Sequence, residues 1–114
     1  MSGRIIAVDF DGTLCIDCYP GIGEANNRLI QCLKELQRSG DRIILWTCRQ
    51  GQILEDALYF CRARGLIFDA VNENLPEITR KYGNDSRKIY ADIYIDDRSM
   101  SPWDWYHTCE RRIG

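Results

Sequence analysis

Acidic side chains follow two short apolar runs of this chain and offer oxygen ligands of the kind found in phosphate and metal sites. Asp9 and Asp11 come directly after the run 5–8, and Asp96 and Asp97 directly follow 93–95. Carboxylates that converge within ~4–6 Å repel one another unless a proton or a cation neutralises them. Mg²⁺ suits such an all-oxygen set, because it needs few protein carboxylates and accepts phosphate oxygens as further ligands. The pattern predicts a site for Mg²⁺ and a phosphate.

The first acidic run divides into distinct chemical roles. Asp9, at a strand end beside a metal, can attack phosphorus and form an aspartyl-phosphate. Asp11, two residues later, can protonate the leaving group and afterwards activate water. Gly12 permits a tight turn, where free N–H groups would cradle the phosphate oxygens. We therefore expect Asp9 as nucleophile, Asp11 as general acid/base and Gly12 as a phosphate-binding residue.

Three further residues offer phosphate ligands, and a fourth completes the metal site. Thr47 can donate one hydrogen bond to a phosphoryl oxygen, Arg49 a forked pair, and Lys88 a compact charge. Asp96 completes the metal's ligand set. Two alternatives stay open, because Thr47 could cap the next helix and Arg49 could be a surface residue at a helix start.

Short apolar runs and helical periodicity predict the elements that position these residues. The runs 5–8, 43–46, 66–71 and 93–95 favour buried strands. Apolar residues spaced i, i+3, i+4, i+7 predict helices within 24–39 and 54–61, ended by Gly40 and Gly65. Glu55 and Asp56 lie early in the second helix and Arg62 lies late, which matches the helix dipole. Short helices are expected over 76–82 and 102–113.

Alternating strands and helices predict an α/β fold with right-handed crossovers. We expect a three-layer, Rossmann-like arrangement, with a mainly parallel sheet and helices on both faces. All strands of such a sheet point their carboxyl ends to one edge, where ligands bind. The 114 residues correspond to one domain, 1–114.

The order of these motifs resembles a known superfamily. The run 9–13, Asp-Phe-Asp-Gly-Thr, is similar to motif one of the haloacid dehalogenase-like (HAD) phosphohydrolases. Thr47 resembles their motif two, Lys88 motif three and Asp96-Asp97 motif four. The runs 43–49 and 95–98 also resemble small, uncharacterised bacterial hydrolases of this superfamily. The resemblance implies Asp9 as nucleophile, Asp11 as acid/base, and Mg²⁺ on Asp9, the Asp11 carbonyl and Asp96.

Two departures from the superfamily pattern bear on the substrate. The gap 14–23 has room only for a loop or a short hairpin, and the gap 72–87 for a short helix, so we expect no cap domain. An open site suits substrates of any size, or a lid from another subunit, and a homo-oligomer fits that arrangement. The plain Asp-Asp of motif four leaves open whether Asp97 contacts the metal.

The sequence therefore predicts a Mg²⁺-dependent phosphomonoesterase that acts through an aspartyl-phosphate. The alternative is a catalytically weak phosphate- or metal-binding module of the same fold that acts with a partner protein. Transfer of the phosphoryl group to an acceptor other than water is a third reading.

Charge and hydropathy exclude other classes of protein. The net charge of −2 argues against a strongly basic nucleic-acid module. A nucleic-acid end could serve only as substrate, steered by basic residues within 80–88, although a solvated face with mixed charges explains these residues better. No apolar run is long enough for a signal peptide or membrane span, so we expect a cytoplasmic protein with no membrane partner.

Six cysteines are expected as free thiols in that compartment. Cys15 and Cys18 have the spacing of half a zinc site, but no second ligand pair accompanies them. Cys48, between Thr47 and Arg49, is expected to line the site without acting as a nucleophile. The aromatic tail residues Trp103, Trp105 and Tyr106 are expected to pack a C-terminal helix on the sheet.

Overall fold

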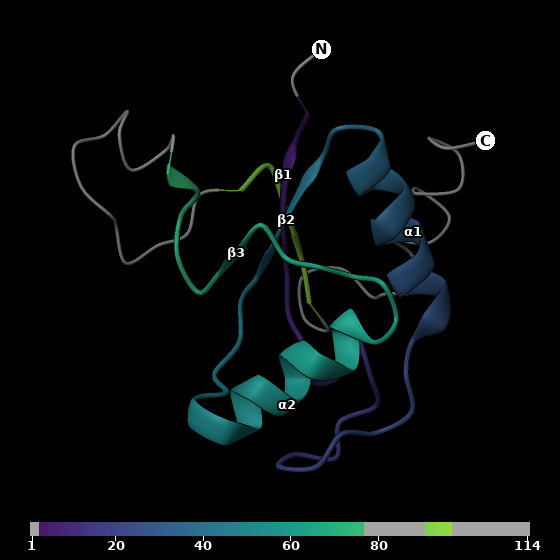
Figure 1. Cartoon of the computed structure of the whole chain (residues 1–114), viewed down its shortest axis with the longest axis vertical. Helices are drawn as coiled ribbons and strands as arrows, with labels where there is room; N and C mark the ends of the chain where they lie inside the picture. The colour runs from purple at the N-terminus through teal and green to yellow at the C-terminus, as the bar shows by residue number, and fades with distance from the viewer. Residues whose placement is uncertain (1–2, 77–90, 97–114) are drawn as a thin grey trace.

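The computed structural model describes residues 3–76 and 91–96 of the chain. These residues contain four parallel strands and two helices (Figure 1). In chain order the elements are β1 (Ile5–Val8), α1 (Asn27–Arg38), β2 (Arg42–Leu45), α2 (Gly51–Arg62), β3 (Ala70–Val71) and β4 (Ile93–Ile95). The parallel α/β fold is confirmed. The expected helix 102–113, nearly all of the expected helix 76–82, and Lys88 and Asp97 lie outside the described residues.

The strand order β3-β2-β1-β4 places β1 inside the sheet (Figure 1). Val8, at the end of β1, is in register with Leu45 of β2 and with Ile95 of β4. The chain moves outward from β1 through β2 to β3 and then returns to pair β4 on the other side of β1. Ligands of parallel sheets bind outside the carboxyl ends of the strands at such a reversal of strand order. The reversal lies between β1 and β4, the strands that carry Asp9 and Asp96.

A short hairpin, residues 14–26, separates β1 from α1. The N–H of Ile16 donates to the carbonyl of Glu24 at 2.9 Å, and the N–H of Asn26 donates to the carbonyl of Leu14 at 2.8 Å. Asn26 then caps α1, because its Oδ1 accepts the N–H of Leu29. Of the loop or short hairpin expected in this gap, the structure has the hairpin. Because residues 24–26 belong to it, α1 begins at Asn27 and not at Glu24.

The second helix begins three residues before the predicted start. α2 starts at Gly51, after Gln50, whose side chain makes no cap hydrogen bond. Glu55 and Asp56 therefore lie beyond the first turn, which contains no acidic residue, and the expected match of these charges to the helix dipole is wrong. Arg62 does lie in the last turn, as predicted.

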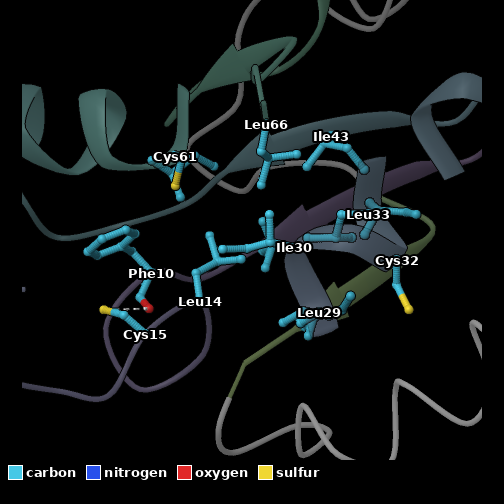
Figure 2. Close-up of a cluster of buried hydrophobic side chains, with 14 of the residues drawn as sticks. Phe10, Leu14, Cys15, Leu29, Ile30, Cys32, Leu33, Ile43, Cys61 and Leu66 are labelled. Carbon is cyan, nitrogen blue, oxygen red and sulfur yellow. Dashed lines mark hydrogen bonds between the residues drawn. The ribbon is translucent and has the colours of Figure 1, made fainter. Parts of the chain in front are cut away.

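One face of the sheet carries the main core. Ile6 and Val8 of β1 and Ile43 and Leu45 of β2 point to this face and pack with side chains of both helices. Figure 2 shows Phe10 and Leu14 from the loop after β1 among them, together with Ile43, Leu66 and residues of α1 and α2. The fully buried members are Ile6, Val8, Phe10, Leu14, Leu29, Leu33, Ile43, Leu45, Ala57, Cys61, Leu66 and Ile95.

The opposite face of the sheet is also buried. Ile5 and Ile44 form a second cluster there with Ala70 and Leu75. Both described helices pack on the first face, so the expected helices on both faces are not seen within the described residues. Within residues 3–76 and 91–96, no helix has the length and apolar character needed to cross a bilayer.

Candidate active site

Asp9 and Asp96 lie side by side at the carboxyl edge of the sheet. Each directly follows one member of the register pair Val8 and Ile95, and the N–H of Asp9 donates to the carbonyl of Ile95 at 3.0 Å. Neighbouring strands are ~4.8 Å apart, so the two carboxylates come from adjacent backbones. Asp9 Oδ1 accepts the N–H of Phe10 at 2.8 Å, which fixes the orientation of the side chain. The predicted convergence of these strand ends is confirmed.

Asp11 turns its carboxylate toward Arg49. Arg49 Nε donates to Asp11 Oδ2 at 2.9 Å and Nη2 donates to Oδ1 at 2.8 Å, so the pair is bidentate. Arg49 is fully buried, and among the described residues it is the largest such side chain. The hydrogen bond that Arg49 donates to Asp11 raises the pKa of the Arg49 guanidinium above its ordinary value. The guanidinium is therefore a permanent buried cation paired with the acid/base candidate.

The remaining donors of Arg49 bind backbone carbonyls. Nη1 donates to Pro20 and to Ile53, each at 3.2 Å, and Nη2 donates also to Gly21 at 2.6 Å. A guanidinium has five N–H groups, and five acceptors are present here. Arg49 is thus not the surface residue that one reading of the sequence allowed. A phosphate could bind it only by displacing one of these acceptors.

The glycine turn after β1 adopts the predicted conformation but uses its amides within the protein. Gly12 has φ +81°, a left-handed conformation that favours glycine. Its N–H donates to the carbonyl of Cys15 at 3.0 Å, and the N–H of Thr13 donates to the carbonyl of Phe10 at 3.2 Å. The amide of Gly12 is therefore engaged in the turn and is not the free phosphate ligand that the sequence suggested.

Thr47 lies beyond the end of β2 with its hydroxyl oriented by a neighbouring amide. The N–H of Arg49 donates to Thr47 Oγ1 at 3.1 Å, so the hydroxyl hydrogen remains available for an acceptor such as a phosphoryl oxygen. Thr47 does not cap α2, because the cap position is occupied by Gln50.

Asn72 supports Thr47 and was missed in the sequence analysis. It directly follows β3, and its Oδ1 accepts the N–H of Thr47 at 2.7 Å. Its backbone is left-handed, with φ +55°, a conformation that asparagine tolerates better than most residues. The signal was present in the sequence, because Asn72 directly follows the predicted strand 66–71, as Thr47 follows the run 43–46.

For the phosphate-ester hydrolysis that the sequence predicts, we expect Asn72→Gly to lower kcat/KM by about 5–10-fold. Glycine keeps the left-handed backbone but removes the acceptor that orients the Thr47 loop, and one such hydrogen bond contributes ~1 kcal/mol. Asn72→Ala should show the same kinetic loss and also a free energy of unfolding lower by roughly 1–2 kcal/mol, because alanine strains the positive φ. Chemical denaturation of both variants separates the two effects. Equal stability of the two variants would contradict the strain argument.

The oxygen donors at this edge fit Mg²⁺ in kind and number. Within the described residues there is no group of three or more His, Cys, Asp or Glu side chains arranged to hold a metal. The carboxylate of Asp11 is held toward Arg49 by one hydrogen bond to each oxygen, so the Asp11 backbone carbonyl, Asp9 and Asp96 are the candidate ligands. One or two carboxylates are enough for Mg²⁺ when water and phosphate oxygens complete the octahedron.

The described cysteines differ in exposure, and Cys15 and Cys18 lie in different environments. Cys15 is buried and Cys18 is exposed, as is Cys48 beside Thr47. Burial raises the pKa of the Cys15 thiol, and it raises the pKa of Cys61 to about 12. The thiolate is the reactive form, so both buried thiols have little of it at neutral pH.

Alkylation with iodoacetamide at pH 8 should therefore label Cys18 and Cys48 first. We expect Cys61 to react at least roughly a hundredfold more slowly, since a raised pKa removes thiolate and burial removes access. Peptide mapping by mass spectrometry measures the rates, and the denatured protein serves as the control in which all sites react. Similar rates at Cys18 and Cys61 in the native protein would contradict the placement of Cys61 in the core.

One solved structure is similar to the chain over nearly its full length. It is a conserved protein from Bacteroides thetaiotaomicron, 40% identical in sequence, with a TM-score of 0.82. The match covers 97% of this chain and 93% of the other. No protein-family model and no curated protein matches the chain.

Proposed function

The chain belongs to the family of this conserved Bacteroides protein, and from the chemistry of its strand ends we propose that it is a Mg²⁺-dependent phosphomonoesterase. The observation that supports the proposal most directly is the register of β1 and β4. That register makes Asp9 and Asp96 neighbours at the reversal of strand order, with Asp11 two residues further on. Phosphate sites with a hard cation need such convergent oxygens.

The proposed reaction proceeds in two steps at Asp9. A carboxylate oxygen of Asp9 attacks phosphorus, the bond to the ester oxygen breaks, and Asp11 gives its proton to the departing alcohol. Water then attacks the aspartyl-phosphate, its proton passes to Asp11, and phosphate leaves with Asp9 regenerated. The second step returns the proton to Asp11 and frees Asp9, so the cycle needs only the ester and water.

Other residues in the proposal bind and neutralise the phosphoryl group. The Thr47 hydroxyl donates one hydrogen bond, and Lys88, outside the described residues, supplies a charge by resemblance to the HAD motif order. Mg²⁺, held by Asp9, Asp96 and the Asp11 carbonyl, would neutralise charge that develops on the phosphoryl oxygens. Arg49 and the Gly12 amide are not phosphate ligands in this proposal, because both already donate hydrogen bonds within the protein.

The proposal also assigns the chain to a particular type of α/β fold. The Asp-Phe-Asp-Gly-Thr run and the parallel sheet support a capless, Rossmann-like HAD core acting on a phosphorylated substrate. The gap between β1 and α1 contains a hairpin of residues 14–26 and no larger insert. A cytoplasmic location accords with the free thiols.

Trapping with beryllium fluoride tests the proposal. Beryllium fluoride with Mg²⁺ mimics the phosphoryl group on an aspartate, and we expect an adduct at Asp9 together with turnover in a broad panel of phosphate esters. No adduct and no turnover across the panel would overturn the phosphatase and favour the binding module. A phosphorylated acceptor in place of free phosphate in a single turnover would show transfer instead of hydrolysis.

A further inference from the structure

We propose that Arg49 is a positioning residue that holds the Asp11 carboxylate and the tip of the hairpin 14–26 as one unit, so that the hairpin controls the proton-transfer step. This inference rests on the proposed function, because Asp11 is an acid/base residue only there. It concerns the link between three segments that are distant in sequence: the loop after β1, the hairpin tip and the start of α2.

The geometry around Arg49 joins these segments through one side chain. Two of its five hydrogen bonds go to Asp11, two go to the hairpin carbonyls of Pro20 and Gly21, and one goes to Ile53 in α2. Nη2 donates to both Asp11 and Gly21, at 2.8 and 2.6 Å, so these two acceptors share a single nitrogen. A shift of the hairpin tip therefore acts directly on the group that holds Asp11.

Aromatic rings complete the enclosure of the guanidinium. Its central carbon lies 4.9 Å from the ring centroid of Phe10 and 5.2 Å from that of Tyr19. Phe10 is fully buried beside Asp11 in sequence, whereas Tyr19 belongs to the hairpin and is 55% exposed. One ring thus comes from the site and the other from the hairpin, and cation–π attraction strengthens the same link.

Because Arg49 is buried, losing only some of its five hydrogen bonds is energetically unfavourable. A buried guanidinium whose N–H groups lose their acceptors incurs a large desolvation penalty, so all five bonds tend to persist together. Residues 16–21 of the hairpin are exposed, so apolar packing contributes little to holding the tip. Arg49 is the buried anchor of this tip, and loss of Arg49 should release the hairpin and Asp11 together.

The pairing leaves Asp11 able to transfer protons. A carboxylate has about four lone-pair positions, and a bidentate arginine occupies one on each oxygen. The second lone pair of each oxygen remains for the proton that passes to the leaving group. Arg49 thus fixes the plane of the carboxylate without blocking its second lone pairs, and this plane sets the direction from which a proton can pass to or from Asp11.

Leaving-group dependence distinguishes this role from a purely structural one. Phenyl phosphate and 4-nitrophenyl phosphate have similar shapes, but phenolate is the poorer leaving group and depends more on a proton donor. We expect Arg49→Lys to lower kcat/KM for phenyl phosphate at least ~10-fold more than for 4-nitrophenyl phosphate. Lysine keeps a positive charge but cannot bind Asp11 and the two carbonyls in one forked plane.

A second variant tests the role of the hairpin while leaving the Asp11 and Arg49 side chains unsubstituted. Tyr19→Ala removes the exposed ring against Arg49 and should fold normally, with a smaller selective loss of about 2–5-fold on phenyl phosphate. Tyr59→Ala, on α2 and 67% exposed, is the matched control and should leave both substrates unaffected. Amide hydrogen exchange at Ile16 and Asn26, whose N–H groups bond across the hairpin, should be about tenfold faster in Arg49→Lys than in wild type.

The outcomes separate this inference from the proposed function. Equal losses on both substrates would reduce Arg49 to a structural residue, and unchanged hydrogen exchange would overturn its link to the hairpin. Wild-type protein without turnover of either ester would remove the proposed function and with it the proton-transfer role. Hydrogen exchange would still decide in that case whether Arg49 anchors the hairpin.

Discussion

Replacing Asp9 by asparagine should lower phosphatase turnover by at least ~10³-fold while leaving the protein folded. An amide has no nucleophilic oxygen for attack on phosphorus, so the aspartyl-phosphate cannot form. Asparagine has nearly the same shape, and its Oδ1 can still accept the N–H of Phe10 as Asp9 does at 2.8 Å. We therefore expect the free energy of unfolding to stay within ~1 kcal/mol of wild type.

The measurement compares two Asp→Asn variants on the same substrates. Asp56→Asn, on the exposed side of α2, removes an equal charge far along the chain from the site and should retain wild-type activity. Beryllium fluoride should modify wild type and Asp56→Asn but not Asp9→Asn. Undiminished turnover by Asp9→Asn would remove Asp9 as nucleophile, even if the protein proved to be a phosphatase.

Chelation of divalent cations should abolish turnover, and Mg²⁺ should restore it. Without a cation, Asp9 and Asp96 place like charges on adjacent strands, and the incoming phosphate adds more negative charge. We expect activity in excess EDTA to fall at least ~10²-fold and to recover on addition of Mg²⁺. Ca²⁺ should restore much less, because it takes more ligands at longer distances in a less regular geometry.

Asp96→Asn tests which residues hold the cation. The Mg²⁺ concentration for half-maximal activity should rise about tenfold or more, since even partners of metal ligands change affinity by 10–100-fold when removed. Asp56→Asn again provides the control with an unchanged requirement. Full activity of wild type in EDTA would overturn the metal assignment without affecting the fold.

The placement of Asp9 and Asp96 could be predicted because it depends on local patterns and one general rule. Short apolar runs are recognisable as buried strands, and parallel strands direct their carboxyl ends to one edge. Residues that immediately follow such runs therefore lie at one edge of the sheet, and the strand order then decides which of them are neighbours. The same reasoning predicts Thr47 at this edge, and it applies equally to Asn72, which follows the run 66–71 and accepts the N–H of Thr47.

The boundaries of the helices were less predictable. Apolar periodicity marks the buried side of a helix, but α1 begins only where the hairpin ends and Asn26 caps it. α2 extends beyond its apolar pattern to Gly51, which moves Glu55 and Asp56 out of the first turn. Helix ends depend on how the flanking backbone satisfies its hydrogen bonds, and periodicity carries no information about that.

The sequence by itself thus determined the α/β fold with its parallel sheet and the meeting of the acidic strand ends, because both follow from the order of apolar runs. Only the tertiary structure decided that Arg49 faces Asp11, 38 residues away in the chain, and not a phosphate. It also decided that the Gly12 amide is engaged. The partners concerned include backbone carbonyls, which every residue has, so their pairing emerges only when burial brings donor and acceptor together and penalises those left unpaired.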